Sequence, residues 1–258
     1  MPHPRLSRME PRPGPSRPIR MTRTLMLTLA AAAILVSGCG QQPSAPPTRA
    51  PEALVGCTQT ESKAAARKAD KVPAKVDLDG DGSTDKVLLT RDDTACPGVL
   101  FTTVKDRRYS AKVRDPAGMD LTSATRVSLP GREGDLLALR AEHPRGGFQV
   151  QVYAFDESLG EVTADGQPVV PFVATDTTGG YLSVTCADGE LVVRQAVAHE
   201  PPGIVFAWDV KETRYAVDGL RATRGATTDV ADNVLDQQLG AEFPDVKHRR
   251  MFARGCSA

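Results

Sequence analysis

The residues best suited to chemistry in this chain form one short acidic loop, Asp77-Leu78-Asp79-Gly80-Asp81-Gly82-Ser83-Thr84-Asp85. Carboxylates recur at positions 1, 3, 5 and 9 of the loop, and they repel one another unless a cation lies among them. Ca²⁺ accepts about 6 to 8 oxygen ligands at flexible angles. Gly80 and Gly82 permit backbone conformations that residues with a Cβ resist. We therefore predict a structural Ca²⁺ site, with a metal-free polar turn as the alternative. The expected ligands are Asp77, Asp79, Asp81, Asp85 and the carbonyl oxygen of Ser83.

The loop resembles the calcium loops of FG-GAP and VCBS repeats, and also the first nine residues of an EF-hand loop. An EF-hand loop places a bidentate Glu at position 12, where this chain has Leu88. The segment Lys86–Leu89 is typical of a strand and not of the exiting helix of an EF-hand. The FG-GAP and VCBS resemblance is therefore the better one. It implies a strand–loop–strand site at which calcium fixes a loop and no catalytic water is involved.

A weaker copy of this pattern follows fifty residues later. Asp135-Leu136-Leu137-Ala138-Leu139 echoes Asp85-Lys86-Val87-Leu88-Leu89, but the acidic ligands are missing. Two copies do not make a complete propeller. We expect a propeller-like fragment or a β-sandwich.

Catalytic signatures are missing from the sequence. It contains no Gly-x-Ser-x-Gly, no HExxH and no phosphate-binding glycine loop. His143 and His199 lie at expected strand ends, where binding sites are common, but a loop histidine is more often simply solvated. His248 belongs to a basic cluster at 247–250 that we expect to be a solvated surface. Core packing is the default role of Trp208, with ligand stacking as the alternative.

A secretory signal is expected at the start of the chain. Met21 to Thr24 is basic, Leu25 to Val36 is an apolar run of about a dozen residues, and Ser37-Gly38-Cys39 closes it. The run is shorter than the roughly 20 residues that span a bilayer, but it suits a signal h-region. The segment resembles a bacterial lipoprotein signal with its lipobox, which implies a lipid on Cys39 and anchoring at the outer face of the membrane.

Three segments are expected along the chain. Residues 1–38 are the signal, with Met21 as the expected true start, and residues 39–56 are a Pro-rich linker after the lipidated cysteine. Residues 57–258 form a β-rich extracytoplasmic domain. Leu54-Val55-Gly56-Cys57 also spells a lipobox, but the Pro-rich stretch before it cannot serve as an h-region.

The remaining cysteines favour disulfides, because an exported chain passes into an oxidising compartment. Four cysteines allow three pairings. Sequential closure favours Cys57–Cys96 and Cys186–Cys256, with one reduced pair as the alternative. We do not expect a zinc site, since the spacings contain no CxxC pair and no Cys/His cluster.

Charge argues against nucleic acid as a partner. The whole chain has 32 basic and 32 acidic residues. Removing residues 1–38 takes away six arginines and one glutamate, which leaves 26 basic and 31 acidic residues. Binding to nucleic acid or to an anionic membrane surface requires a basic footprint.

The periodicity predicts a mainly β fold of antiparallel sheets with one C-terminal helix. Short apolar runs separated by Gly, Pro and Asp turns indicate strands. Phe148–Phe155 alternates strictly and is predicted to be a half-buried strand. Asp188-Gly189 predicts a hairpin turn. A short helix is expected near Ala64–Ala69. The C-terminal helix is expected to begin at Thr228 or Asp229 and to end at Gly240, with Val230, Val234, Leu235 and Leu239 on one face. The expected strands are Lys86–Thr90, Val99–Val104, Tyr109–Arg114, Ala124–Leu129, Asp135–Ala141, Phe148–Phe155, Tyr181–Cys186, Glu190–Ala198, Ile204–Val210 and Thr213–Val217.

Together these features favour a non-catalytic lipoprotein that binds, senses or regulates at the cell envelope, with an envelope protein or a glycan as partner. The region around Gly189–Val193, Trp208-Asp209 and Arg214-Tyr215 loosely resembles small regulatory lipoproteins of high-GC bacteria. The alternative is a cell-wall or carbohydrate hydrolase that uses Asp156-Glu157 or Glu200, since glycosidases need two carboxylates in one cleft. A calcium-stabilised adhesion or glycan-binding module is a third reading.

Overall fold

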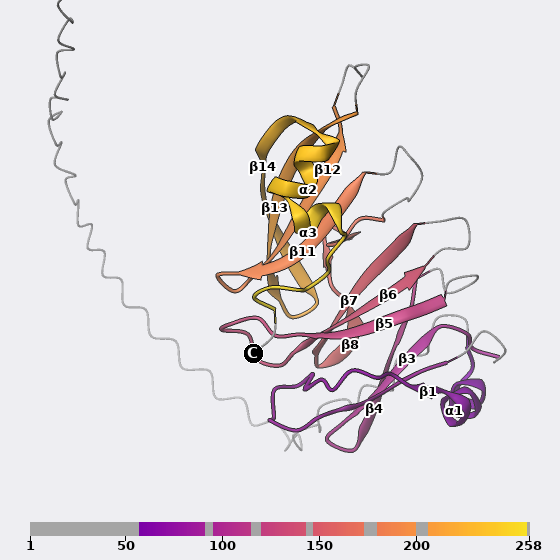
Figure 1. The fold of residues 1–258 in the computed structure, drawn as a ribbon. Helices are drawn as coiled ribbons and strands as arrows, with labels where there is room; N and C mark the ends of the chain where they lie inside the picture. Colours follow the sequence, from indigo (N-terminus) through magenta and orange to yellow (C-terminus); the bar gives the residue numbers. More distant parts are fainter. Residues whose placement is uncertain are drawn as a thin grey trace, which may run out of the picture. The chain divides into compact units, whose positions relative to one another are not determined.

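The computed structural model describes residues 57–90, 95–114, 120–142, 147–172, 180–199 and 206–256. Cys39, the signal at 1–38, the linker at 39–56, His143 and Glu200 lie outside these residues. Within them the fold is mainly β, as the sequence predicts (Figure 1). The described residues form three sheets of mostly antiparallel strands and three short helices.

The first sheet has the order β1-β2-β3-β4, and the second has the order β5-β6-β7-β8. Each is an antiparallel meander of four strands, and β1 and β2 are joined by the acidic loop. The strands are β1 (Asp70–Lys71), β2 (Lys86–Leu89), β3 (Val99–Val104), β4 (Arg107–Lys112), β5 (Asp120–Val127), β6 (Leu136–Glu142), β7 (Phe148–Asp156) and β8 (Ser158–Glu161).

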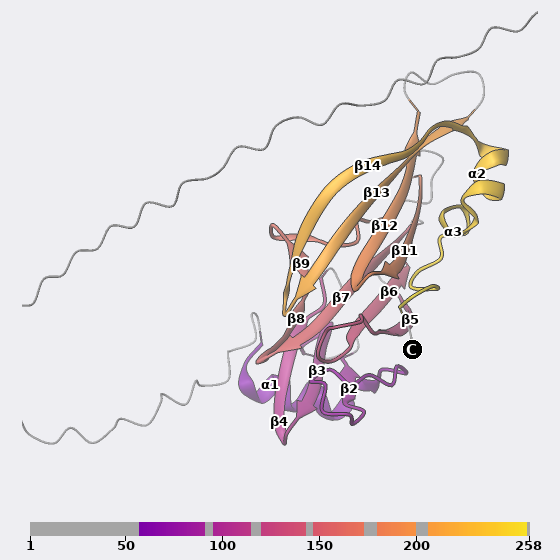
Figure 2. The ribbon, with the colours of Figure 1, turned by 90° about the vertical axis from the view of Figure 1, so that its left-hand side faces the viewer.

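The third sheet has the order β10-β9-β14-β13-β12-β11 and is antiparallel except where β14 meets β9. Its long strands β13 and β14 curve side by side (Figure 2). The expected strands Ile204–Val210 and Thr213–Val217 prove to be parts of β13, with Ile204 and Val205 outside the described residues. The strands are β9 (Thr163–Ala164), β10 (Gln167–Pro168), β11 (Tyr181–Ala187), β12 (Glu190–Ala198), β13 (Ala207–Asp218) and β14 (Arg221–Leu235).

The sheets stack as three layers, with β5–β8 in the middle (Figure 1). Alternate residues of β6 take part in opposite cores. Leu136 and Ala138 belong to the core shared with the third sheet, whereas Leu137 and Leu139 belong to the core shared with the first. Because side chains alternate along a strand, a sheet between two others buries side chains on both of its faces.

The prediction that Phe148–Phe155 is half-buried is wrong, because the first sheet covers its polar face. Gln149 and Gln151, on that face, are 7% and 2% exposed. The side-chain amides of both donate to the carbonyl oxygen of Arg114, at 2.9 and 2.8 Å. Oε1 of Gln151 accepts from the Arg114 backbone N–H at 2.8 Å and from the Tyr153 hydroxyl at 2.7 Å. These hydrogen bonds satisfy the buried amides.

The predicted C-terminal helix begins too early. Residues 221–235 form β14, and α2 (Asp236–Glu242) starts after it and includes Gly240; a second helix, α3 (Pro244–Lys247), follows. Val234 and Leu239 are buried, but Val230 and Leu235 are each 42% exposed, so the helical stripe does not exist. The tight turn at Gly219-Leu220 lets this segment pair with β13 along its length, and tertiary pairing overrides local periodicity.

The N-terminal helix α1 (Gln59–Lys68) is longer than expected, because Thr58 and Glu61 form a capping box ahead of the alanines. Its Ala65 and Ala66 pack on Val99 and Phe101 of β3. The described cysteines form the pairs Cys57–Cys96 and Cys186–Cys256, which are the pairs that sequential closure favours.

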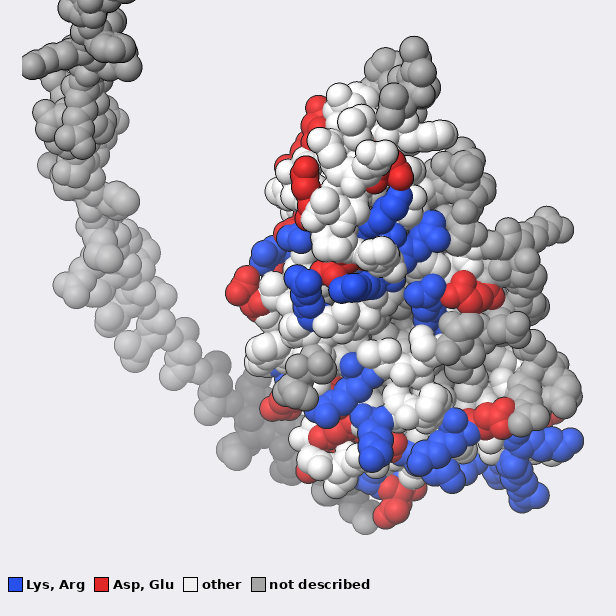
Figure 3. Space-filling view, in the orientation of Figure 1, with Lys and Arg blue, Asp and Glu red and all other residues white. Residues whose placement is uncertain are grey.

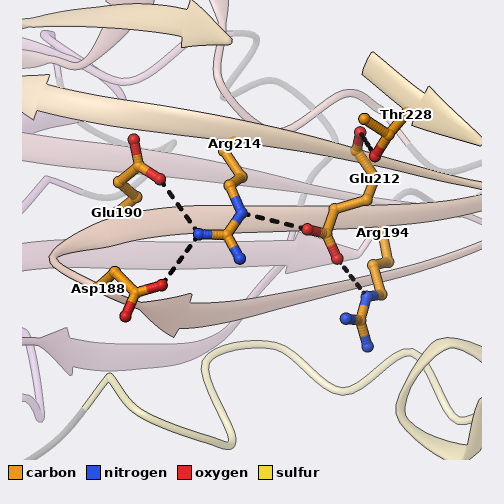
Figure 4. A network of polar contacts seen from close by, with 6 residues as sticks. All are labelled: Asp188, Glu190, Arg194, Glu212, Arg214 and Thr228. Carbon is orange, nitrogen blue, oxygen red and sulfur yellow. Dashed lines mark hydrogen bonds and ion pairs between the residues drawn. The ribbon is translucent and has the colours of Figure 1, made fainter. Parts of the chain in front are cut away.

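A ladder of ion pairs lies across β12 and β13 (Figure 4). Arg214 Nη1 lies 3.1 Å from Asp188 and 3.5 Å from Glu190, and its Nε lies 3.3 Å from Glu212. Glu212 also binds Arg194 Nε at 2.7 Å. Burial acts to raise the pKa of Glu212, but the hydrogen bonds from the two arginines outweigh it and the net shift is downward. The ladder therefore favours an ionised Glu212.

Candidate metal-binding loop and the adjoining groove

The acidic loop is closed at its base by the strand backbone. Val76 and Asp85 form an isolated antiparallel bridge, in which the Asp85 N–H donates to the Val76 carbonyl at 2.8 Å. Gly80 and Gly82 have φ angles of 72° and 87°, in the left-handed region that glycine adopts without a steric penalty. The loop thus runs from the isolated bridge at Val76 to β2, which begins directly after Asp85.

Backbone N–H groups fold the carboxylates inward. Asp77 accepts from Gly80 at 2.9 Å and from Gly82 at 2.8 Å, one on each oxygen. Asp85 Oδ2 accepts from Leu78 at 2.7 Å. As a result, ligand oxygens of Asp77, Asp79 and Asp85 all lie within 4.8 Å of one another.

Asp79 is the residue of this group that most strongly indicates a bound cation. Its side chain is 5% exposed, and its Oδ2 atom is buried without a hydrogen-bond partner. Lys105 Nζ lies 3.4 Å from this oxygen, on a side chain that is 74% exposed. A buried carboxylate oxygen without a hydrogen bond is costly, and a cation among the carboxylates would remove that cost.

The electrostatics of Asp85 point the same way. Burial raises the pKa of Asp85, and the neighbouring carboxylates of Asp79, Asp77 and Asp81 raise it further, against the hydrogen bond from Leu78. A bound cation would reverse this balance by favouring the ionised form. The converging atoms are all carboxylate oxygens, the donors that a hard cation such as Ca²⁺ prefers.

The structure brings together three of the four predicted acidic ligands. Asp81 is outside the converging group, and its Oδ1 accepts from the Ser83 N–H at 2.7 Å. Both residues are exposed. Asp81 and Ser83 thus shape the tip of the loop, while Asp77, Asp79 and Asp85 form its interior.

The weaker sequence copy docks directly on the acidic loop. The Asp77 N–H donates to Asp135 Oδ2 at 2.8 Å, and the Asp135 N–H donates to the Asp77 carbonyl at 2.6 Å. Asp135 also binds Arg126 at 2.7 Å and accepts from the Ser128 hydroxyl. A Cβ added to Gly80 would lie 2.7 Å from the backbone nitrogen of Gly134, so glycine is required for this close approach. This segment therefore joins the second sheet to the acidic loop of the first.

A polar groove of about 530 Å³ lies beside the loop. Its walls come from the acidic loop and from hairpin turns of all three sheets. Arg132 lies between them, and its Nη1 donates to the carbonyls of Glu133 and Gly134, each at 2.7 Å. Burial lowers the pKa of Arg132, against the opposing influence of Asp156, Asp135 and Asp218. The lining residues include Asp79, Lys105, Arg132, Asp156, Glu157 and Asp218.

The other candidate residues are dispersed. Asp156 and Glu157 line the groove. His199 contacts Asp209 and Asp232 instead. His248 directly follows α3, and its backbone N–H donates to the carbonyl of Pro244, the first residue of that helix. Trp208 is 4% exposed and meets the Tyr181 ring edge-on at 5.0 Å, which confirms its core role.

The basic cluster at 247–250 is partly paired rather than freely solvated. Lys247 binds Asp236 at 2.6 Å and Arg250 binds Asp245 at 3.2 Å. On the face shown in Figure 3, basic and acidic side chains are interspersed.

No family model, curated protein or solved structure matches this chain. Among the described residues, no helix combines the length and apolar character needed to cross a membrane.

Proposed function

We propose that this chain is an extracytoplasmic lipoprotein, anchored through Cys39 at the outer face of the cell membrane. In this proposal it is a non-catalytic binding, sensing or regulatory module with a calcium-stabilised loop. The convergence of Asp77, Asp79 and Asp85 around a buried oxygen without a hydrogen bond carries the proposal. The signal-like segment at 21–39 supports the proposed location at the outer face of the membrane, and two disulfides suit an oxidising compartment.

Calcium at this loop would fix one wall of the groove. Leu78 and Asp79 belong to both the loop and the groove, and the loop is hydrogen-bonded to Asp135 of the second sheet. Ordering the loop would therefore fix the first sheet against the second at the groove, where we expect a ligand to bind. An envelope protein or a glycan is the partner we propose for this groove, because its lining is polar and carries both signs of charge.

Calcium should raise the melting temperature of the full-length chain, because a ligand that binds only the native state must stabilise it. The effect should amount to about 2.7 kcal/mol at a calcium concentration of 100 times Kd. Asp79→Asn should abolish the shift, since it neutralises the buried ligand. Asp81→Asn, the matched control, should reduce the shift less, because Asp81 is outside the converging group. An unchanged melting temperature in excess calcium, measured by calorimetry against chelator, would refute the calcium site.

Cys39→Ala should move the chain from the membrane fraction to the soluble fraction, because the thioether-linked lipid would be lost. Cys57→Ala is the matched control, since Cys57 also follows a lipobox-like tetrapeptide but is paired with Cys96. Immunoblots of fractionated cells provide the measurement. Retention of Cys39→Ala in the membrane fraction would contradict lipid anchoring.

A hydrolase is the second candidate, because Asp156 and Glu157 line the groove together with Asp218. Paired carboxylates are the groups that glycoside hydrolysis needs. Release of reducing ends from purified cell wall, lost in Asp156→Asn and Glu157→Gln, would favour this function over the non-catalytic one. No release at all by the folded chain would count against it.

A further inference from the structure

Among the described residues, a second group of side chains that could bind a metal ion lies in the third sheet, apart from the acidic loop. His199 directly follows β12, and its backbone N–H donates to the Ala207 carbonyl at 2.9 Å. Asp209 in β13 pairs with Val197. Because side chains two residues apart share a face of a strand, His199 and Asp209 project from the same face of the third sheet.

A β-bulge brings in the third member. β13 advances two residues from Trp208 to Val210, while β14 covers three between their partners Val234 and Ala231. The extra residue allows Asp232 to approach the same face, and a bulge often re-aims a side chain in this way. Asn233 beside it has a φ of 54° and donates its backbone N–H to Asp209 Oδ1 at 3.0 Å. The backbone therefore holds Asp209 in place.

The resulting geometry is compact. His199 Nδ1 lies 2.7 Å from Asp209 Oδ1 and 3.4 Å from Asp232 Oδ1, and the three ligand atoms lie within 4.8 Å of one another. The side chains of His199 and Asp209 are 26% and 24% exposed, whereas Asp232 is 78% exposed. Two ligands are thus held against the sheet, and one is free to adjust.

We propose that His199 Nδ1 and the carboxylates of Asp209 and Asp232 bind a divalent transition metal of the Zn²⁺ type. Imidazole nitrogen suits Zn²⁺, Cu²⁺ and Ni²⁺, whereas Ca²⁺ prefers oxygen ligands alone. Three protein ligands leave a coordination position for water, as in open zinc sites. This site is independent of the calcium loop, and it has a different donor set.

Charge balance favours a divalent ion over a proton at this site. A protonated imidazole supplies one positive charge against two carboxylates, whereas a divalent ion with a neutral imidazole neutralises both. Lys211 is the next cation on this face of β13. Its Nζ lies 3.8 Å from Asp229, so its charge is balanced by Asp229 and not by the cluster. Metal binding at Nδ1 requires that this nitrogen carry no proton, so binding to a protonated His199 would release one proton to solvent.

The test is a titration of the full-length chain with Zn²⁺. The chain is purified in detergent without thiol reductants, and excess Ca²⁺ is present throughout so that the acidic loop is already occupied. Isothermal calorimetry should report one Zn²⁺ per chain. His199→Gln and Asp232→Asn should weaken binding roughly tenfold or more. His248→Gln, which removes a histidine outside the cluster, should bind as the parent chain does. Circular dichroism and metal-free melting of each variant would show that the fold is intact.

Cu²⁺ provides a second readout, because Trp208 is the only tryptophan and is adjacent to Asp209. Cu²⁺ at the site should quench its fluorescence in the parent chain and in His248→Gln, and His199→Gln should not be quenched at the same concentration. The proposal would be overturned if folded His199→Gln bound Zn²⁺ as tightly as the parent chain, or if the parent chain showed no saturable binding. His199, Asp209 and Asp232 would then form an ion pair and not a metal site. Neither outcome bears on the calcium loop.

Discussion

Single residues decide how the layers of this fold meet. Tyr153 is fully buried, burial raises the pKa of its hydroxyl, and the group therefore remains a donor, bonded to Gln151. Gln151 in turn satisfies both backbone groups of Arg114. Gln151, together with Gln149, thus connects the second sheet to the Arg114 backbone beside the first sheet.

Gln151→Leu should lower the free energy of unfolding by about 1–3 kcal/mol for each buried group left unpaired. The apolar side chain fits the volume, but it cannot bond Arg114 or the Tyr153 hydroxyl. Gln167→Leu, at an exposed position in β10, should change stability by no more than about 0.5 kcal/mol. Urea unfolding of both variants measures the difference. Equal stability of the two variants would show that these hydrogen bonds contribute nothing net.

At the scale of elements, the junction of β14 with α2 and α3 depends on a small polar cluster. Asp236 Oδ1 accepts from Lys247 Nζ at 2.6 Å and from Trp208 Nε1 at 3.0 Å, and Lys247 also donates to the Tyr181 hydroxyl at 2.8 Å. The hydrogen bond from Lys247 is the main reason that the pKa of Asp236 is lowered. The cluster links α2, α3, β11 and β13.

Acid should loosen this junction. A carboxyl whose pKa is lower in the folded chain stabilises it above the usual carboxyl pKa of about 3.9, and this contribution is lost as pH falls through the lowered value. Because Asp236 is 43% exposed, the effect should be at most about 1 kcal/mol. Below about pH 4, the fluorescence of Trp208 should change in the parent chain.

Asp236→Asn should remove this acid transition, and Asp229→Asn, at a carboxylate that is 80% exposed, should preserve it. An identical transition in Asp236→Asn would assign the acid sensitivity to other carboxylates.

At the scale of the whole molecule, the C-terminal tail joins two sheets. Phe252 N–H donates to Val184 at 2.7 Å and Cys186 N–H donates to Arg254 at 3.0 Å, so the tail lies along β11. The Ser128 N–H donates to the Cys256 carbonyl at 2.7 Å, which connects the tail to the second sheet. Cys256 is fully buried in the core between these sheets.

The double variant Cys186→Ser, Cys256→Ser should lower the free energy of unfolding by about 2–5 kcal/mol. The bond joins residues 70 apart in sequence and holds the tail in the larger core. The matched double variant of Cys57 and Cys96 opens a loop of 39 residues at α1 and should cost less. Denaturant unfolding under oxidising conditions measures both. A larger cost at Cys57–Cys96 would contradict the role assigned to the tail.

Local chemistry was readable from the sequence because it depends on neighbours in the chain. The spacing of Asp77 to Asp85 predicts the inward-turned loop, the alternation of apolar residues predicts the mainly β fold, and the Asp188-Gly189 turn predicts the β11–β12 hairpin. Each depends on backbone preferences within a few residues.

Only the tertiary structure decided the relations that depend on residues far apart. The first sheet buries Gln149 and Gln151, because it covers the face of β7 on which they lie. Long-range pairing with β13 makes a strand of residues that read as a helix. The docking of Asp135 on Asp77, and the meeting of His199, Asp209 and Asp232 at a bulge, depend on sheet register. Register is set by the whole core and cannot be read from any one segment.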